Sequence, residues 1–500
     1  MNDPILWTLI SIQVFMGAFD TLVHHEGTER LAWRASQKTE LRLHGVRNIF
    51  YALIFLCFGW FEPHGIYTII LVMILTVEVL ITLWDFVEED LTRKLPATER
   101  VNHTLLALNY GAILALASPV LYDWAMMPNS ITPTHYGWWS AFATVSALGV
   151  AVFGLRDLLA ASRSDRLIPS DAQALLGNLD GRKSILITGA TGFIGTRLVE
   201  SLVANHHDVT VMTRKKENAD HLAHPVRVIT DFDQIQNDDT FDVIINLAGA
   251  SVAGGLWTTK RREMLTRCRV DMTTAIIQLV ERLEQRPEVL INGSAIGWYG
   301  LHESEALDEN AAANPSFTHE LCEAWEREAN SAKALGLRVV TLRIGLVLGV
   351  EGGMMAKLLT PFEFGLGGAF GKGQQWMSWI GLDDTVRAIG FAIADNTLEG
   401  PVNITAPNPE RNERFTKALG AALKRPTVFR VPAKVLTLAL GDLARETMLG
   451  GQKVMPKKLL DAGFEFREPE LEPCLKRIVG AVQPATTRGP KVPTPQPALG

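Results

Sequence analysis

The sequence predicts an all-α multi-pass transmembrane domain of about five helices, then an α/β domain with a doubly wound parallel sheet and a small C-terminal α/β domain. Two observations lead to this fold class. Long apolar stretches are confined to the first third of the 500 residues, which accounts for a charged fraction of only 20% in the whole chain. From residue 184 onward, short apolar runs alternate with helical stretches, which is typical of βαβ units.

Each of the apolar stretches before residue 160 approaches the roughly 17 to 25 residues that a helix needs to cross a bilayer. They lie at residues 6–23, 46–61, 66–87, 105–121 and 138–155. The first has no basic segment before it and no small-residue cleavage motif after it, so we expect it to remain as an anchor. The alternative is a buried helical bundle in a soluble protein.

Positive charges in the connecting segments predict the orientation, because Lys and Arg are retained on the cytoplasmic side of a membrane. They gather between the first two stretches, between the third and fourth, and after the fifth. They are Arg30, Arg34, Lys38, Arg42, Arg93, Lys94, Arg100, Arg163 and Arg166. The opposite segments, 62–65 and 122–137, contain neither Lys nor Arg. We therefore expect an integral inner-membrane protein with its N-terminus outside and everything after residue 160 in the cytoplasm.

Three acid/His pairs at i, i+4 lie near the expected cytoplasmic ends of these stretches, where a helix would place both members on one face. The pairs are Asp20/His24, Glu40/His44 and Glu99/His103. Imidazole and carboxylate together can bind Zn or non-haem Fe, and helical bundles build such sites from facing side chains. The candidate metal ligands are His24, His44, His103, Glu40 and Glu99. The alternative is that these groups face water and lipid headgroups.

The charge balance and the cysteines exclude several classes of protein. Lys and Arg number 48 against 54 Asp and Glu, so the net charge of −6 offers no strongly basic surface for a nucleic acid. The four cysteines are far apart and form no CxxC pair, which argues against a disulfide framework and a cysteine-built zinc site. We expect no nucleic-acid partner, and a reducing compartment for the part outside the membrane.

A strand, a glycine turn and a helix follow one another after residue 183. Residues 184–188 (SILIT) have the pattern of a buried strand, and GATGFIG follows at 189–195. In such a turn Gly189 permits the tight bend, Gly192 lets the backbone approach a pyrophosphate, and Gly195 lets the helix pack close to the strand. The context predicts a Rossmann-type dinucleotide site. Its candidate binding residues are Gly189, Thr191, Gly192, Phe193, Ile194 and Gly195.

The second predicted strand, residues 208–213, ends in a basic turn. In sites selective for NAD an acidic residue at this place binds the ribose hydroxyls, and its carboxylate would repel a 2′-phosphate. Here Arg214 and Lys215 can pair with that phosphate instead. The sequence thus favours NADP(H) over NAD(H), the alternative being a solvated basic turn. Further strands are expected at 226–230, 242–246, 289–294 and 337–342, with helices such as 259–283 and 317–335 between them.

Several motifs of this region resemble the extended short-chain dehydrogenase/reductases, the group of NAD(P)-dependent epimerases. They are TGATGFIG at 188–195, NLAGA at 246–250 and NGSAIGWYG at 292–300. More narrowly, CEAWE at 322–326, LRIGLVLG at 342–349 and SWIGLDDTVRAI at 378–389 are similar to the atypical YfcH-like branch. GGQKVMPKKLLDAGFEFREPEL at 450–471 resembles the small C-terminal domain of that branch. The resemblance covers residues 184–479 and assigns nothing to the membrane part.

The resemblance implies an active-site serine at Ser294 and places Asn246, Ala248 and Gly249 beside the cofactor. Members of the superfamily also use a Tyr-x-x-x-Lys dyad, in which the tyrosine is the acid/base. Tyr299 is the only tyrosine after residue 136, so it is the catalytic candidate that accompanies Ser294.

This sequence departs from the dyad. Glu303 stands four residues after Tyr299, where the lysine would be, and alignment of CEAWE puts Thr318 and Cys322 at the tyrosine and lysine places. Without a neighbouring cation a phenol keeps a pKa near roughly 10 and is a poor base at neutral pH. His302, Glu303 and His319 are other acid or base candidates near in sequence.

We expect a transmembrane domain at 1–160 and a linker at 161–183. An NADP(H)-binding domain at 184–345 would follow, and then a substrate-side and C-terminal domain at 346–480 that includes the family-specific module at 430–479. We expect residues 481–500 to form a disordered proline-rich tail. The expected function is that of a membrane-anchored, NAD(P)-binding epimerase-like or oxidoreductase-like protein. Its substrate would be small or lipid-associated and would bind at the cytoplasmic face. The alternative is a non-catalytic, membrane-tethered NADP(H)-binding regulator or scaffold.

Overall fold

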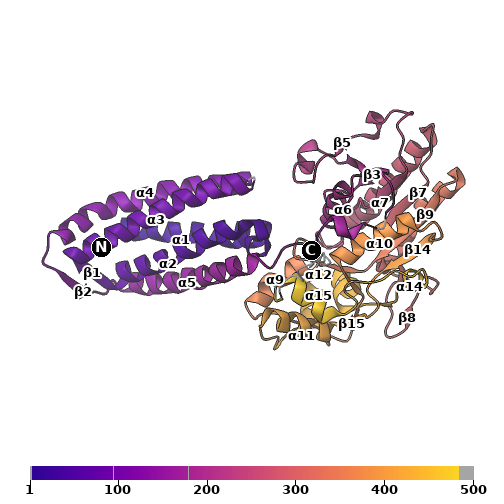
Figure 1. Ribbon diagram of the computed structural model, residues 1–500. Coiled ribbons are helices and arrows are strands. Elements are labelled where there is room, and N and C mark those ends of the chain that lie inside the picture. Colours follow the sequence, from indigo (N-terminus) through magenta and orange to yellow (C-terminus); the bar gives the residue numbers. More distant parts are fainter. Residues whose placement is uncertain (1–2, 94, 178, 483–500) are drawn as a thin grey trace, which may run out of the picture. The chain divides into compact units, whose positions relative to one another are not determined.

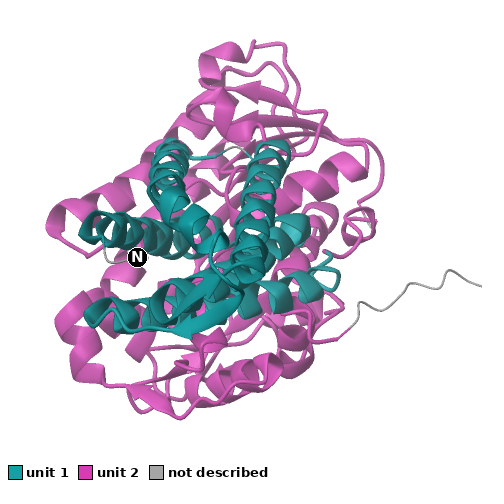
Figure 2. Cartoon of the chain, turned by 90° about the vertical axis from the view of Figure 1, so that its left-hand side faces the viewer, with its two compact units in different colours: residues 1–168 teal, residues 169–500 magenta. Residues whose placement is uncertain are grey.

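The computed structural model describes residues 3–93, 95–177 and 179–482 (Figure 1). The chain divides into two compact units, Met1–Ile168 and Pro169–Gly500, which are coloured separately in Figure 2. The division falls inside the linker expected at 161–183. Most of the tail expected at 481–500 lies outside the described residues.

Five long helices form the first unit and run side by side in Figure 1. They are α1 (Pro4–Phe19), α2 (Lys38–Trp60), α3 (Ile66–Thr92), α4 (Ala97–Ala125) and α5 (Trp138–Ser164). All are long and apolar enough to cross a membrane, α1 being extended by the π-helical segment η1 (Asp20–Glu29). The short strands β1 (Phe61–His64) and β2 (Ser130–Pro133) pair in antiparallel register.

Local sequence signals explain where these helices begin and how one tolerates a proline. Helix α1 starts with Pro4 after Asp3, whose carboxylate accepts a hydrogen bond of 2.8 Å from the backbone N–H of Ile5. Pro119 inside α4 has no N–H to donate to the carbonyl of Ala115 one turn earlier. The hydroxyl of Ser118 donates to that carbonyl at 2.9 Å, so the backbone acceptor keeps a partner.

Two glycines let α2 and α5 pack closely. A Cβ atom on Gly45 would lie 2.6 Å from the side chain of Leu158, and a Cβ on Gly154 would lie 2.9 Å from the carbonyl oxygen of Gly45. Both distances are shorter than real Cβ contacts, so only glycine fits. Helices α2 and α5 therefore approach each other closely at these two positions.

A seven-stranded parallel sheet forms the centre of the second unit, and its strand order is β14-β9-β7-β6-β3-β4-β5. The strands are β3 (Ser184–Thr188), β4 (Asp208–Met212), β5 (Arg227–Ile229), β6 (Val243–Asn246), β7 (Val289–Ala295), β9 (Arg338–Ile344) and β14 (Gly400–Ile404). The order reverses on the two sides of β3, as in a doubly wound Rossmann-type sheet. The predicted fold of this unit is confirmed.

Helices cover both faces of the sheet, so the strands are apolar at successive positions. On β3, Ile185 and Ile187 point into the core under α6 and α10, whereas Leu186 points into the core under α7 and α8. All three side chains are fully buried. The covering helices are α6 (Phe193–Ala204), α7 (Thr259–Arg282), α8 (Phe317–Asn330) and α10 (Leu382–Ala394).

The rest of the second unit consists of short helices and two-stranded pairings. The helices are α9 (Met355–Glu363), α11 (Asn412–Leu423), α12 (Ala433–Leu440), α13 (Asp442–Ala444), α14 (Lys457–Asp461) and α15 (Leu471–Ile478). The paired strands are β8 (Ala306–Leu307) with β17 (Lys453–Val454), β10 (Leu346–Leu348) with β13 (Trp379–Gly381), β11 (Gly368–Phe370) with β16 (Phe429–Val431), and β12 (Trp376–Met377) with β15 (Glu410–Arg411).

The expected boundary between the cofactor domain and the substrate side, at residue 345, does not match the sheet, because strand β14 lies after it. Strand β14 pairs in parallel with β9, with Val402 opposite Leu342, and α10 covers the same sheet. Gly400 and Pro401 begin this strand and interrupt its apolar pattern. The sheet therefore recruits residues that the sequence assigned to the substrate side.

Candidate functional site

The glycine turn leaves the carboxyl end of β3 at the point where the strand order reverses, which is where doubly wound sheets bind their ligands. Gly189 has a φ of +74°, and a Cβ there would lie 2.5 Å from the carbonyl carbon of Leu247. A Cβ on Gly195 would lie 2.3 Å from the carbonyl oxygen of Gly189. The turn thus brings the amino end of α6 close to the strand, with Gly192 exposed at its tip.

The amino end of α6 can hold a phosphate, because its first N–H groups have no partner within the helix. Phe193 and Ile194 contribute their backbone at this end, next to the half-buried Thr191. A Cβ on Gly352 would lie 2.5 Å from the ring of Phe193, so this ring packs against the glycine-rich segment after β10. Candidate cofactor residues 191–195 therefore lie together.

Asn246 ends β6 and ties together the neighbouring strand ends from a fully buried position. Its Oδ1 accepts a hydrogen bond of 2.6 Å from the hydroxyl of Thr188, and its Nδ2 donates to Asn292 at 2.7 Å and to Thr273 at 3.0 Å. The backbone N–H of Ala248 also points to Oδ1 of Asn246, at 3.3 Å. Asn246 thus shapes the floor of the site rather than its open surface.

The remaining predicted cofactor residues lie at the same sheet edge. Arg214 and Lys215 are exposed just beyond β4, whose end pairs with the end of β3. Gly249 follows β6, where a Cβ would lie 2.9 Å from the guanidinium carbon of the buried Arg269. Two basic groups therefore stand beside the turn that would hold a pyrophosphate.

Ser294 begins a chain of buried hydrogen bonds at the carboxyl end of β7. Its hydroxyl donates to Glu326 of α8 at 2.6 Å, and Arg343 of β9 donates to both oxygens of Glu326 at 2.9 and 3.0 Å. Arg343 also donates to the hydroxyl of Tyr299 at 3.1 Å. That hydroxyl in turn donates to Asn403 of β14 at 2.8 Å.

The structure places Tyr299, the catalytic candidate from the sequence, in the core. Its side chain has an exposed fraction of 0%. Burial raises the pKa of Tyr299 to about 12, although Arg343 acts in the opposite direction. A phenol in this position holds its proton at neutral pH and links Arg343 to Asn403. Its side chain is separated from the hydroxyl of Ser294 by Glu326 and Arg343.

A carboxylate from the C-terminal part contacts the place where the usual tyrosine would stand. Glu446 accepts hydrogen bonds from the backbone N–H and the hydroxyl of Thr318, each at 3.0 Å. Thr318 packs beside the segment after β7, since a Cβ on Gly297 would lie 2.9 Å from its Cβ. One turn along α8, Cys322 stands at the lysine place, and burial raises the pKa of its thiol to about 11, so the thiol is neutral at neutral pH. A thiol carries no positive charge in either protonation state, so it does not replace the lysine.

Glu446 lies far from Thr318 in the sequence, and no spacing or motif connects the two. Its neighbours Arg445 and Thr447 give no pattern of an active-site acid. Only the folding of the C-terminal segment onto α8 identifies Glu446 as a functional candidate.

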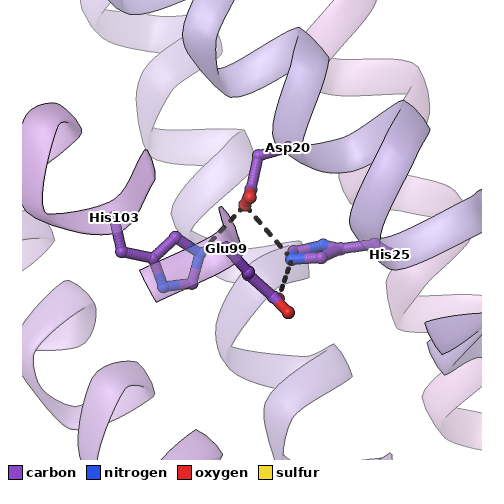
Figure 3. Close-up of side chains that lie close together, drawn as sticks. All are labelled: Asp20, His25, Glu99 and His103. Atoms are coloured by element: carbon purple, nitrogen blue, oxygen red, sulfur yellow. Dashed lines mark hydrogen bonds and ion pairs between the residues drawn. The ribbon is translucent and has the colours of Figure 1, made fainter. Parts of the chain in front are cut away.

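Inside the first unit, histidines and carboxylates from α2, α3, α4 and η1 meet in two groups. One group is Asp20, His25, Glu99 and His103, and the other is His25, Glu40, His44 and Glu89. Within each group the nearest ligand atoms all lie within 4.8 Å of one another, and all these side chains are buried. Figure 3 shows the first group, with His25 and His103 on either side of Asp20.

The groups include four of the five predicted metal ligands and leave out His24. Segment η1 is a π-helix, whose hydrogen bonds run from i to i+5, so His25 also reaches Asp20 at 3.3 Å. His24 has both ring nitrogens engaged, with Asp20 at 2.8 Å and with the hydroxyl of Thr98 at 3.2 Å. The sequence spacing assumed an α-helix, and the π-helix adds His25 to the same face.

Two family models match the second unit. Residues 185–405 match the NAD dependent epimerase/dehydratase family, and residues 431–478 match a domain of unknown function, DUF1731.

This chain aligns with almost the whole length of several curated relatives. The chloroplastic epimerase family protein SDR39U1 homolog of Arabidopsis thaliana is 35% identical over 307 residues, which are 60% of this chain and 88% of the relative. The epimerase family protein YfhF of Bacillus subtilis is 32% identical over 59% of this chain and 98% of its own.

Solved structures show the same fold. The human epimerase family protein SDR39U1, crystallised with NADPH, has a TM-score of 0.54 and 29% identity, covering 60% of this chain and 100% of its own. A nucleoside-diphosphate sugar epimerase from Corynebacterium glutamicum has a TM-score of 0.50 and 27% identity, and the match covers 71% of this chain and 68% of the epimerase chain.

The buried chain of hydrogen bonds generates a test. Substituting Glu326→Gln leaves the Arg343 guanidinium buried without its counter-charge, and we expect the free energy of unfolding to fall by about 3 kcal/mol. Glu323→Gln changes an exposed residue of the same helix and is the matched control. Chemical denaturation of both variants measures the difference. Equal stabilities would mean that the ion pair contributes nothing to the fold.

Proposed function

This chain belongs to the NAD dependent epimerase/dehydratase family, and we propose that it is a membrane-anchored oxidoreductase or epimerase that prefers NADP(H) over NAD(H). The observation that carries the cofactor preference is the pair of exposed basic residues, Arg214 and Lys215, at the end of β4. The human relative is a protein solved with NADPH, which supports the same choice here.

The residues present fit a dinucleotide. The 189–195 turn, in which Gly189 and Gly195 leave no room for a Cβ, leads into α6. The amino end of α6 lies at the switch point of the sheet, the place where the strand order reverses, and this arrangement suits a pyrophosphate. When bound, the cofactor donates or accepts a hydride at its nicotinamide ring. The protein must then move a proton at the substrate oxygen. Ser294 can orient a substrate hydroxyl by accepting its hydrogen bond, because the proton of Ser294 itself is donated to Glu326.

We propose Glu446, acting through the hydroxyl of Thr318, as the group that moves this proton. The carboxylate and the hydroxyl are 3.0 Å apart, and they stand at the place of the tyrosine in other superfamily members. Tyr299 is less suited, because it is buried and its pKa is raised to about 12. The C-terminal module would thus complete the active site.

The proposal of a membrane anchor is based on the apolar outer surface of the first unit. Large apolar side chains point outward from its helices, with exposed fractions of 69% for Phe15, 60% for Leu80 and 76% for Trp138. Such a surface is unfavourable in water and suits lipid. The basic residues between the helices favour an N-terminus outside and a second unit in the cytoplasm, where it would meet a small or lipid-associated substrate.

The second candidate function is a non-catalytic, membrane-tethered NADP(H)-binding regulator or scaffold. Two observations favour it: Cys322 is a neutral thiol where a catalytic lysine would stand, and Tyr299 is buried. Cofactor binding is common to both functions, so only product formation separates them.

The cofactor preference predicts an asymmetric effect of Arg214→Ala. Loss of a charge-assisted contact to the 2′-phosphate should weaken NADPH binding by about tenfold or more, and NADH binding little. Arg286→Ala, an exposed residue just before β7 at the opposite sheet edge, is the control. Fluorescence titration gives both dissociation constants. Equal losses for the two nucleotides would contradict the phosphate contact.

The proton-transfer role predicts loss of turnover without loss of cofactor. Glu446→Gln and Ser294→Ala should each lower NADPH-dependent product formation from a membrane extract by about 10² or more, with NADPH affinity unchanged. Glu472→Gln, exposed on α15, should keep full activity. Mass spectrometry detects the product. If wild type forms none, the regulator is favoured; if both variants keep full activity, the residue assignment is wrong.

The membrane topology predicts which engineered cysteines a membrane-impermeant maleimide reaches in intact cells. Thr132→Cys, exposed in β2, should be labelled from outside, whereas Arg100→Cys, exposed on α4, should react only after lysis. The reverse pattern would invert the proposed orientation, and labelling of both in a soluble fraction would exclude the anchor.

A further inference from the structure

The polar cluster of the first unit contains more negative than positive charge. Its five carboxylates are each at most 5% exposed, and they are Asp20, Glu40, Asp85, Glu89 and Glu99. Arg47 pairs with Asp85 at 2.6 Å, and Arg93 pairs with Glu40 and Glu99 at 2.9 and 2.7 Å. Three carboxylate charges remain among apolar helices, where unpaired charge is strongly unfavourable.

Several ligand atoms in this cluster make no hydrogen bond among the described residues. Neither carboxylate oxygen of Glu89 has a hydrogen-bond partner. Nε2 of His25 lies 3.3 Å from Asp20 and Nε2 of His44 lies 2.9 Å from Asp85, but neither pair has the geometry of a hydrogen bond. These side chains are 1%, 6% and 2% exposed, so water does not reach them freely. In a folded protein such atoms normally find a partner.

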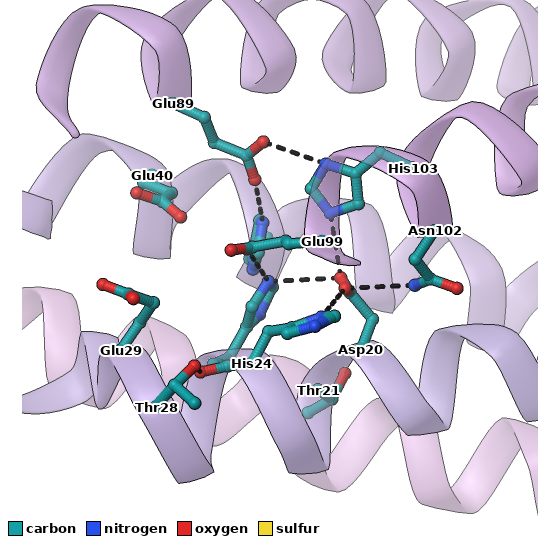
Figure 4. Close-up of polar contacts among 12 residues, drawn as sticks. Asp20, Thr21, His24, Thr28, Glu29, Glu40, Glu89, Glu99, Asn102 and His103 are labelled. Carbon is teal, nitrogen blue, oxygen red and sulfur yellow. Dashed lines mark hydrogen bonds and ion pairs between the residues drawn. The ribbon is translucent and has the colours of Figure 1, made fainter. Parts of the chain in front are cut away.

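The spacing of these atoms suits a metal ion better than a hydrogen bond. Glu89 Oε2 lies 3.3 Å from His103 Nδ1, Glu89 Oε1 lies 3.6 Å from His44 Nε2, and His25 Nε2 lies 3.7 Å from Glu99 Oε1. Ligands bound tetrahedrally at about 2.1 Å lie about 3.4 Å apart. Figure 4 shows Glu89 directed toward His103, on the opposite side of the cluster from His24.

Protonated histidines are the other way to balance the charge, and the geometry opposes a positive charge on His25 and His44 together. The rings of His25 and His44 are stacked, with centroids 4.4 Å apart and planes inclined by 25°. Two imidazolium cations at this separation, with little water between them, repel each other. Neutral imidazoles with lone pairs directed at a cation avoid that repulsion.

We propose that the first unit binds two adjacent divalent transition-metal ions, one held by Asp20, His25, Glu99 and His103 and the other by Glu40, His44 and Glu89, with the carboxylate of Glu89 between them. Oε2 of Glu89 faces the group that contains His103, and Oε1 faces the group that contains His44. Imidazole and carboxylate ligands without a thiol suit Fe(II) or Zn(II).

The surrounding residues fit the outer part of such a centre. Arg93 holds Glu40 and Glu99 in place by hydrogen bonds, and Asn102 donates to Asp20 at 3.1 Å. Metal-binding carboxylates are usually hydrogen-bonded by a second layer of side chains in this way. The inference does not depend on the proposed function of the second unit.

The test is a metal titration of the full chain, purified in mild detergent and freed of metal by a chelator. Co(II) is the probe, because its visible absorption reports ligand geometry and elemental analysis counts the retained ions. We expect two equivalents per chain after desalting, and displacement of the Co(II) spectrum by Zn(II). Retention of one equivalent or less by the wild-type chain would overturn the proposal.

Matched variants locate the ions. Glu89→Gln and His25→Gln should each lower Co(II) affinity at least tenfold, since both residues contribute ligand atoms. His135→Gln changes an exposed histidine of the same unit that belongs to neither group, and it should retain two equivalents. Circular dichroism checks that each variant is helical. Equal loading of His135→Gln and Glu89→Gln would also overturn the proposal.

Discussion

The cost of burying charge is the constraint on which both units depend. In the second unit Glu326 and Arg343 lie within the fold, with side chains only 8% and 3% exposed, and each is tolerated because the other is 2.9 Å away. Their pairing aligns α8 with β9 and gives Ser294 and Tyr299 hydrogen-bond partners. The ion pair therefore fixes the sheet edge where the chemistry would occur, and its loss would disturb that edge as well as the core.

In the first unit the same constraint acts on a larger set of groups. Five buried carboxylates face two guanidinium groups and the histidines, within helices whose outer surface is apolar. A bound cation would balance the excess negative charge and would also give a partner to the carboxylate oxygens of Glu89, which make no hydrogen bond among the described residues. Buried charge is thus balanced in different ways in the two units: by a salt bridge in the second unit and by a proposed pair of metal ions in the first.

Much of the second unit could be predicted from the sequence, because its signals are local. The strand at 184–188, the glycines of the turn and the basic end of β4 each act through neighbours in the chain. The burial of Tyr299 could not be predicted in this way, since it depends on tertiary packing and not on the neighbouring residues in the chain. Glu446 was missed because its contact with Thr318 depends on how the C-terminal segment folds. His25 belongs to the cluster because η1 is a π-helix, whereas the i, i+4 spacing of Asp20 and His24 predicts an α-helix.

The central claim is that the switch point of the sheet holds NADP(H), with its reactive end toward Ser294. The most direct measurement is an experimental structure of the full chain with NADPH. We expect the pyrophosphate at the 189–195 turn, the 2′-phosphate beside Arg214 and the nicotinamide beside Ser294. A 2′-phosphate away from Arg214, or a nicotinamide remote from Ser294 and Thr318, would contradict it.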